Sequence, residues 1–251
     1  MLQHIPVDDR GTELYYQDVG DGPAVTFVHG FSGNHLTWWQ QIPTFSSSYR
    51  CLVPDQRRFG LSTDAADGGV SRFPDDLAAL LDGLDVDRTA LVGHSMGGWT
   101  VASFATQYPD RVSALVLSAT PGGLLSPERH RSFVEESTPA SDVEPLSPAM
   151  THLADSIAAL NLDAPDEWAE TRPALDALPI DADRITDAGI PTLLVVGAGD
   201  EFMPKSAADE LATRLDATTV VVGEAAHSIH FEQPEPFNRA VDAFLDENVT
   251  R

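Results

Sequence analysis

The chain has 251 residues, 42% of them hydrophobic and 22% charged, and its 39 acidic residues against 15 basic ones give a formal net charge of −24. This composition fits one compact globular chain rather than a disordered one, and the negative charge excludes nucleic acid and anionic membranes as partners. No apolar run approaches the roughly 20 residues that span a bilayer, and residues 1–10 lack the apolar core of a signal peptide, so we expect a cytoplasmic protein.

Short apolar runs in the first half of the chain predict buried β-strands. These runs cover residues 24–28, 51–54, 89–92 and 112–117, and residues 12–18 alternate in the way that predicts a further strand. Leucines at helical spacing predict a helix over 73–84, and a second helix is expected over 99–108, where Pro109 ends it. Because the strands are nearly all apolar and alternate with helices, the sequence predicts a parallel sheet that is covered on both faces.

The region from residue 121 to residue 179 breaks this pattern. It is rich in proline and acidic residues and contains amphipathic segments at 150–160 and 168–178. We interpret it as a helical cap inserted into a core domain of residues 1–120 and 180–251. Such a cap would cover the crevice at the carboxyl ends of the strands, where α/β sheets bind ligands. The core then resumes with two strands and a terminal helix, at 192–196, 218–222 and 234–245.

Residues 93–97 have the sequence Gly-His-Ser-Met-Gly, which fits the pattern G-x-S-x-G between a predicted strand and a predicted helix. A turn from strand into helix this tight needs flanking positions that are nearly free of side chains. It lifts the serine hydroxyl clear of the backbone at a helix N-terminus. The dinucleotide-binding pattern G-x-G-x-x-G is not met. The motif therefore predicts Ser95 as a nucleophile.

A serine hydroxyl needs a base to take its proton, and in this kind of strand–turn–helix arrangement the partners follow in the order serine, acid, histidine. Asp200 follows the predicted strand at 192–196, and His227 follows the one at 218–222. Both loops should leave the same edge of the sheet as Ser95. We expect His227 to act as the base and Asp200 to orient it, with Glu201 as the alternative acid.

Two backbone amides are expected to bind the negative oxygen of a tetrahedral intermediate. The first is that of Met96, the residue after the nucleophile. The second is that of Phe31, which follows His29 and Gly30 at the end of the strand at 24–28.

The remaining histidines and the single cysteine carry no clear chemical motif. His230 lies near His227, but no further ligands stand nearby, so we expect no metal site and interpret His230 as a packed or solvated neighbour. His94 is interpreted as structural, and Cys51 as a buried, inert thiol. Four further histidines are expected at the surface: His4, His35, His130 and His152.

Together these residues resemble the α/β-hydrolase superfamily, within its compact group of esterases, lactonases, perhydrolases and C–C hydrolases. Residues 29–31 match the oxyanion segment of the family, Trp38 falls where many members carry tryptophan, and residues 227–234 resemble the histidine loop. Residues 55–62 match the turn D-x-R-G-x-G-x-S, except that Arg58 replaces its first glycine. The resemblance implies an eight-stranded, mostly parallel sheet with helices on both faces, a helical cap and no cofactor.

Within this superfamily, haloalkane dehalogenases and epoxide hydrolases carry aspartate at the position of Ser95. A serine there implies acyl transfer to water, and we expect a serine hydrolase acting on small to medium, apolar carboxylic esters or lactones. The expected pocket residues are Phe31, Met96, Trp168, Phe202 and Ile229. The alternatives are a C–C bond hydrolase or a cofactor-free perhydrolase with the same triad, or a ligand-sensing receptor of this fold.

The acidic excess is accompanied by a depletion of lysine, since Lys205 is the only one in the chain. This composition resembles that of proteins from extreme halophiles, and the alternative is an ordinary acidic protein. Repulsion among the negative charges destabilises the compact state at low ionic strength. At about 1 M salt the Debye length falls to about 3 Å, and this repulsion is largely screened.

We therefore expect the melting temperature to be clearly higher in multimolar KCl than in dilute buffer, because screening removes the repulsion that opposes folding. Thermal unfolding followed by circular dichroism over a series of KCl concentrations measures this. Equal melting temperatures across the series would contradict the halophilic interpretation.

Overall fold

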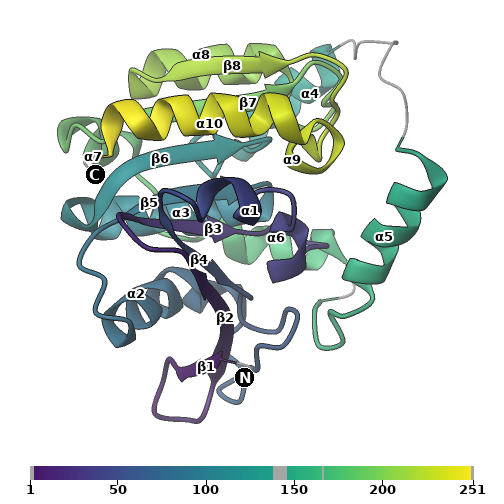
Figure 1. The fold of residues 1–251 in the computed structure, drawn as a ribbon. Helices are drawn as coiled ribbons and strands as arrows, with labels where there is room; N and C mark the ends of the chain where they lie inside the picture. Colours follow the sequence, from purple (N-terminus) through teal and green to yellow (C-terminus); the bar gives the residue numbers. More distant parts are fainter. Residues whose placement is uncertain (1–2, 138–145, 166, 250–251) are drawn as a thin grey trace.

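A computed structural model describes residues 3–137, 146–165 and 167–249. Its strands form one eight-stranded sheet in the order β1-β2-β4-β3-β5-β6-β7-β8 (Figure 1). The strands are β1 (Gln3–Pro6), β2 (Glu13–Val19), β3 (Ala24–Val28), β4 (Arg50–Pro54), β5 (Thr89–His94), β6 (Val112–Ser118), β7 (Thr192–Gly197) and β8 (Thr218–Val222). Strand β2 pairs antiparallel with β1 and β4, and the remaining pairs are parallel. The predicted mostly parallel sheet is confirmed.

Helices cover both faces of the sheet, as predicted. One face packs against α2 (Phe73–Gly83), α3 (Met96–Gln107), α7 (Ala182–Asp187) and α8 (Lys205–Leu215). The other face packs against α1 (Ile42–Phe45), α9 (Ile229–Glu232) and α10 (Pro234–Asn248). Short 3-10 helices complete the core: η1 (His35–Trp38), η2 (Gly69–Arg72) and η3 (Pro109–Arg111).

The two apolar layers follow from the alternation of side chains along each strand. In β5, Ala90 and Val92 belong to the layer beneath α10, whereas Leu91 belongs to the layer beneath α3. All residues of β3 and β5 are buried. A strand buried on both faces is apolar at most positions, which is why these runs were detectable as hydrophobic segments. The buried hydroxyls of Thr26 in β3 and Thr89 in β5 lie 3.0 Å apart and are hydrogen-bonded to each other.

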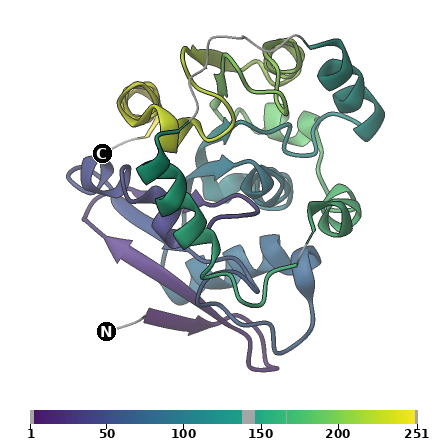
Figure 2. The same cartoon turned by 90° about the vertical axis from the view of Figure 1, so that its right-hand side faces the viewer.

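The described residues of the region predicted as a cap, which precedes α7, form three helices: α4 (Pro127–Glu136), α5 (Pro148–Ala158) and α6 (Trp168–Asp176). Helix α5 stands at the side toward which the parallel strands point, and Figure 2 shows it from that side, in front of the body of the protein. Residues 138–145 and 166 of the predicted cap lie outside the described residues. Among the described helices, none combines the length and apolarity needed to cross a bilayer.

The expectation that His35 and His130 lie at the surface is wrong. Their side chains are buried because each ring finds a polar partner inside the protein. His35 Nδ1 lies 2.9 Å from a carboxylate oxygen of Asp55, and His130 Nε2 lies 2.7 Å from the carbonyl oxygen of Phe202. The other two histidines of this set, His4 and His152, are exposed as expected.

A buried guanidinium joins α2 to two loops, the one between β1 and β2 and the one after β4. Arg57 is 1% exposed. Its Nε and Nη2 donate to the two carboxylate oxygens of Asp76 at 2.8 and 2.6 Å, and Nη1 donates to Asp64 at 2.7 Å. Nη2 also donates to Asp8 at 3.1 Å. This bidentate, charge-assisted geometry is the strongest form of side-chain hydrogen bond, and the bonds with Asp76 raise the pKa of Arg57.

Replacing Arg57 by methionine leaves Asp76 buried without its cation, so we expect the free energy of unfolding to fall by about 3–5 kcal/mol. The matched control is Arg72→Met, because Arg72 and Asp75 form an exposed ion pair, and such pairs contribute about 0–1 kcal/mol. Urea unfolding in concentrated KCl measures both variants. Equal losses in the two variants would show that the Arg57 network adds nothing beyond a surface pair.

Candidate active site

Ser95 occupies a strained turn between β5 and α3. Its φ of 49° and ψ of −119° lie in a region that residues with a side chain rarely adopt. The Ser95 N–H donates to the carbonyl oxygen of Ser118 at 2.9 Å, which fixes the turn against β6. A Cβ at Gly97 would collide with the carbonyl oxygen of Val28. The motif therefore requires glycine here for space as well as for the turn.

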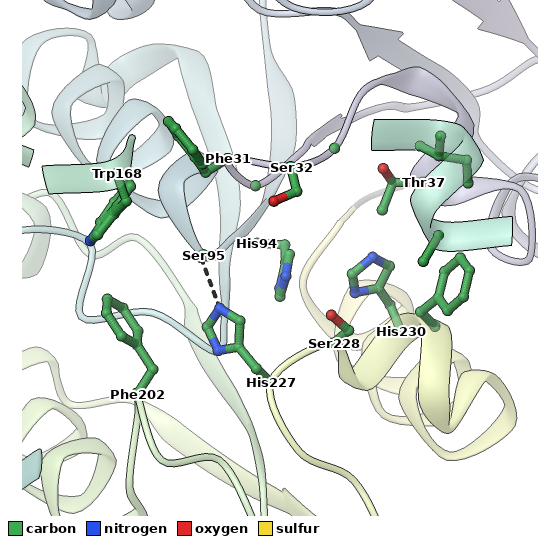
Figure 3. A pocket seen from close by; sticks show the side chains of 15 residues that line it. Phe31, Ser32, Thr37, His94, Ser95, Trp168, Phe202, His227, Ser228 and His230 are labelled. Atoms are coloured by element: carbon green, nitrogen blue, oxygen red, sulfur yellow. Dashed lines mark hydrogen bonds between the residues drawn. The ribbon is translucent and has the colours of Figure 1, made fainter. Parts of the chain in front are cut away.

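The structure brings the three predicted triad side chains together at the carboxyl ends of the strands. His227 Nε2 lies 2.9 Å from Ser95 Oγ (Figure 3), and His227 Nδ1 lies 3.1 Å from each carboxylate oxygen of Asp200. Glu201, the alternative acid, is exposed and has no hydrogen bond to His227. The hydroxyl, imidazole and carboxylate thus form one continuous chain of hydrogen bonds, the arrangement in which a histidine can take a proton from serine.

The loop after β7 holds the carboxylate of Asp200 in place. Its Oδ1 accepts hydrogen bonds from the backbone N–H groups of Phe202 at 2.8 Å and Met203 at 3.0 Å. Asp200 is 3% exposed, so its carboxylate is bound by these two N–H groups and by His227 in place of water. A carboxylate bound in this way stays oriented toward the imidazole.

Glu232 fixes the loop that carries His227, and sequence reasoning missed it. Its carboxylate accepts hydrogen bonds from the backbone N–H groups of Ala226 and Ser228, the two neighbours of His227. Glu232 lies in α9, directly after the histidine loop. An acidic residue five positions beyond a predicted catalytic histidine, in front of a proline-initiated helix, is the signal that could have indicated such a clamp.

Two neutral histidines pack behind the triad. The rings of His94 and His227 have centroids 5.2 Å apart, and the ring of His230 lies 4.5 Å from those of His94 and Trp38. Burial lowers the pKa of His230 to about 3 and lowers the pKa of His94 well below its usual value. Both rings are therefore uncharged at neutral pH, and neither places a positive charge beside His227.

The backbone amides of Phe31 and Met96 are free to bind an anionic oxygen. Neither N–H has a hydrogen-bond partner among the described residues, and that of Met96 is the first in α3, where no intrahelical acceptor exists. A Cβ at Gly30 would lie 3.1 Å from Ser95 Cβ, so the segment that precedes Phe31 runs directly beside the nucleophile. Two amides flanking a serine hydroxyl are the donor set that an oxyanion needs.

A buried histidine shapes the segment that carries the Phe31 amide. His29 Nδ1 lies 2.8 Å from the carbonyl oxygen of Gly30, and its Nε2 accepts from the backbone N–H of Gln56 at 3.0 Å. Because a carbonyl oxygen only accepts, Nδ1 must carry the proton. Burial lowers the pKa of His29, which keeps this neutral tautomer in place.

A cavity of about 320 Å3 opens beside Ser95 and His227. Three of the predicted pocket residues line one side of it (Figure 3): Phe31, Trp168 and Phe202. The opposite side carries hydroxyl and imidazole groups, from Ser32, Thr37, Ser228 and His230. Helix α5 adds Ala154 and Ile157. Phe231 also belongs to the lining, so the nucleophile lies between an aromatic side of the cavity and a remainder that mixes polar and apolar groups.

The other two predicted pocket residues, Met96 and Ile229, do not line the cavity. Both side chains are fully buried. Met96 points into the cluster that contains Trp99 and Leu175, and Ile229 belongs to the layer beneath α10. Their positions next to Ser95 and His227 in sequence suggested contact, but the first turn of each helix directs these side chains into the core.

No group of three or more histidine, cysteine, aspartate or glutamate side chains in the described parts of the chain is arranged to hold a metal ion. His227 and His230, which are close together in the sequence, have separate environments. His227 contacts Ser95 and Asp200, whereas His230 packs between Trp38 and His94.

Comparisons with known proteins agree with this architecture. A family model described as the alpha/beta hydrolase fold matches residues 23–142. The 2-hydroxy-6-oxo-2,4-heptadienoate hydrolase of Pseudomonas putida is 32% identical in an alignment 269 residues long, gaps included. This alignment covers 94% of this chain and 93% of that protein. An epoxide hydrolase 2 of Siraitia grosvenorii is 38% identical over only 120 residues, 46% of this chain and 38% of its own length. A solved thermophilic esterase from Thermogutta terrifontis is 28% identical with a TM-score of 0.77, and the alignment covers 99% of this chain and 100% of that one.

We expect Glu232→Ala to slow the covalent labelling of Ser95 by a fluorophosphonate about 100-fold, because His227 loses the carboxylate that positions its loop and a shift of about 1 Å can cost that much. Mass spectrometry of the labelled protein over time gives the rate. The control is Glu235→Ala, since the Glu235 side chain is 89% exposed and three residues further along. A labelling rate unchanged in Glu232→Ala would contradict the positioning role.

Proposed function

Since the chain belongs to the α/β-hydrolase fold family, we propose that the protein is a serine hydrolase that cleaves carboxylic esters or lactones bearing small to medium, uncharged groups. The hydrogen-bond chain from Ser95 through His227 to Asp200, at the edge of a cavity, is the observation that carries this proposal. It provides a nucleophile, a base and an orienting carboxylate within reach of one bound substrate.

In the acylation step, Ser95 Oγ attacks the carbonyl carbon of the ester while His227 Nε2 takes the hydroxyl proton. The carbonyl oxygen becomes negatively charged and is bound by the Phe31 and Met96 amides. The Asp200 carboxylate stabilises the imidazolium that forms at His227. When the tetrahedral intermediate collapses, the C–O bond to the alcohol breaks, and His227 gives its proton to that oxygen. The products are the free alcohol and an acyl group on Ser95.

Deacylation repeats these steps with water in place of serine. His227 removes a proton from a water molecule, whose oxygen attacks the acyl carbon, and the same amides bind the oxyanion. Collapse breaks the bond to Ser95 Oγ, which regains its proton from His227. The carboxylic acid leaves, and for a lactone the alcohol and the acid are released as one molecule.

We propose further that residues 121–179 form a cap over the core of residues 1–120 and 180–251. Support comes from α5 and α6, which contribute Ala154, Ile157 and Trp168 to the cavity wall. The enzyme would work in a cytoplasm of high salt, for which the acidic composition is the support.

C–C bond hydrolysis with the same triad is the second candidate, because the Pseudomonas putida relative is by name a hydrolase of a dienoate. A dienoate carries a carboxylate, which favours a cationic partner in its pocket. None of the 15 residues that line the cavity is lysine or arginine. The arginine of α6, Arg172, lies over the Trp99 ring and donates to Asp176 at 2.8 Å. These features favour an uncharged ester, as does the esterase likeness.

The proposal is tested with p-nitrophenyl esters of increasing acyl length in concentrated KCl. We expect turnover by the wild-type protein and a loss in kcat on the order of 10⁴-fold or more in Ser95→Ala. Ser71→Ala is the matched control, because Ser71 is an exposed serine whose hydroxyl donates to the carbonyl oxygen of Gly68. An acyl chain that ends in a carboxylate should give a lower kcat/KM than a neutral chain of equal length.

Full activity in Ser95→Ala would reject Ser95 as the nucleophile. Turnover of a dienoate without turnover of any ester would replace the ester proposal by C–C hydrolysis. Tight binding of a small ligand without turnover would indicate the sensing role instead.

A further inference from the structure

A single asparagine joins three segments around the candidate oxyanion site. Asn161 follows α5, and its Nδ2 donates to the carbonyl oxygens of Ser32 and Gly33, both at 3.2 Å. Its Oδ1 accepts from the backbone N–H of Gly60 at 2.8 Å and from Asn34 Nδ2 at 3.2 Å. A carboxamide has two N–H donors and two acceptor lone pairs, and all of them are used here.

The orientation of this carboxamide is fixed by its partners. The carbonyl oxygens of Ser32 and Gly33 can only accept, so they must face the amide nitrogen of Asn161. The backbone N–H of Gly60 can only donate, so it must face the amide oxygen. A flipped side chain would lose all three bonds, which means that the arrangement specifies asparagine rather than any polar residue.

The segment bound by Asn161 continues directly from Phe31, whose amide is a proposed oxyanion donor. Asn34, in this same segment, also contacts α5 directly, because its Nδ2 donates to the carbonyl oxygen of Ile157 at 2.8 Å. Its Oδ1 accepts from the N–H of Leu36, so Asn34 at the same time caps the helix η1. The hydrogen bonds of Asn34 to Ile157 and Asn161 therefore join α5 and the chain after it to the residues that immediately follow Phe31.

Arg58 forms a second hydrogen bond to the segment that follows α5 and contains Asn161. It replaces the glycine expected in the turn at residues 55–62 and keeps a positive φ of 72°. Its Nε donates to the carbonyl oxygen of Asp163 at 2.8 Å, two residues beyond Asn161. Because arginine stands here in place of glycine, its long side chain can donate a hydrogen bond to the chain that follows α5.

We propose that Asn161 is a positioning residue that couples the docking of α5 to the placement of the Phe31 amide, a role that rests on the proposed ester hydrolysis. Helix α5 lines the cavity through Ala154 and Ile157, and Asn161 makes the position of that wall and the position of the oxyanion donor interdependent. Loss of Asn161 then affects the chemical step even for a substrate whose acyl group is too short to gain from the cap.

The test compares Asn161→Ala with wild type on p-nitrophenyl acetate and on a longer-chain ester. We expect kcat for the acetate to fall about 10- to 100-fold with little change in KM, because displacing an oxyanion donor costs on this scale. The inhibition constant of an alkylboronic acid, which forms a tetrahedral adduct with the serine, should rise by a similar factor. Leu162→Ala is the control, since Leu162 is the next residue and is 88% exposed.

Arg58→Gly provides an independent variant, because glycine accepts the positive φ and only the tie to Asp163 is lost. It should lower kcat for the acetate less than Asn161→Ala does, at an unchanged melting temperature. A raised KM for the long ester with an unchanged kcat for the acetate would overturn the coupling and leave Asn161 a residue of the pocket wall. Wild-type turnover together with an inactive Ser95→Ala tests the proposed function separately, and a wild type that neither turns over esters nor binds the boronic acid would overturn both.

Discussion

The strained turn at Ser95 is the constraint on which the rest of the site depends. It holds a non-glycine residue at positive φ, a conformation that costs on the order of 1–3 kcal/mol and persists only where its surroundings enforce it. Two features enforce it here: the hydrogen bond from the Ser95 N–H to β6, and the close approach of Gly97 to the end of β3. Because the turn is packed between two central strands, the hydroxyl and the Met96 amide have little freedom to move.

The other functional groups are each fixed by backbone donors and acceptors close to them. Amides of its own loop orient Asp200, and Glu232 binds the amides on both sides of His227. The neutral ring of His29 shapes the segment before Phe31. Three loops leave the same edge of one sheet, and each carries one group of the chain of hydrogen bonds from Ser95 through His227 to Asp200. This is the geometry that general base catalysis requires.

Sequence patterns were sufficient where the determining physics is local. A strand buried on both faces is a mostly apolar run, and the turn at Ser95 needs its glycines, so β3, β5 and the position of Ser95 could be predicted. Asp200 and His227 could be predicted from their places after two such strands, in the order serine, acid, histidine. Strand β1 was not, because it is a short edge strand whose residues are largely exposed. The burial of His35 and His130, the inward direction of Met96 and Ile229, and the contacts of Asn161 depend on residues distant in the chain. No local pattern encodes such pairings.

The most direct measurement is a crystal structure of the protein after reaction with a fluorophosphonate. We predict a phosphonyl group bonded to Ser95 Oγ, with its phosphoryl oxygen about 3 Å from the nitrogens of Phe31 and Met96 and His227 still paired with Asp200. An adduct on another residue, or a phosphonyl oxygen directed away from both amides into solvent, would contradict it.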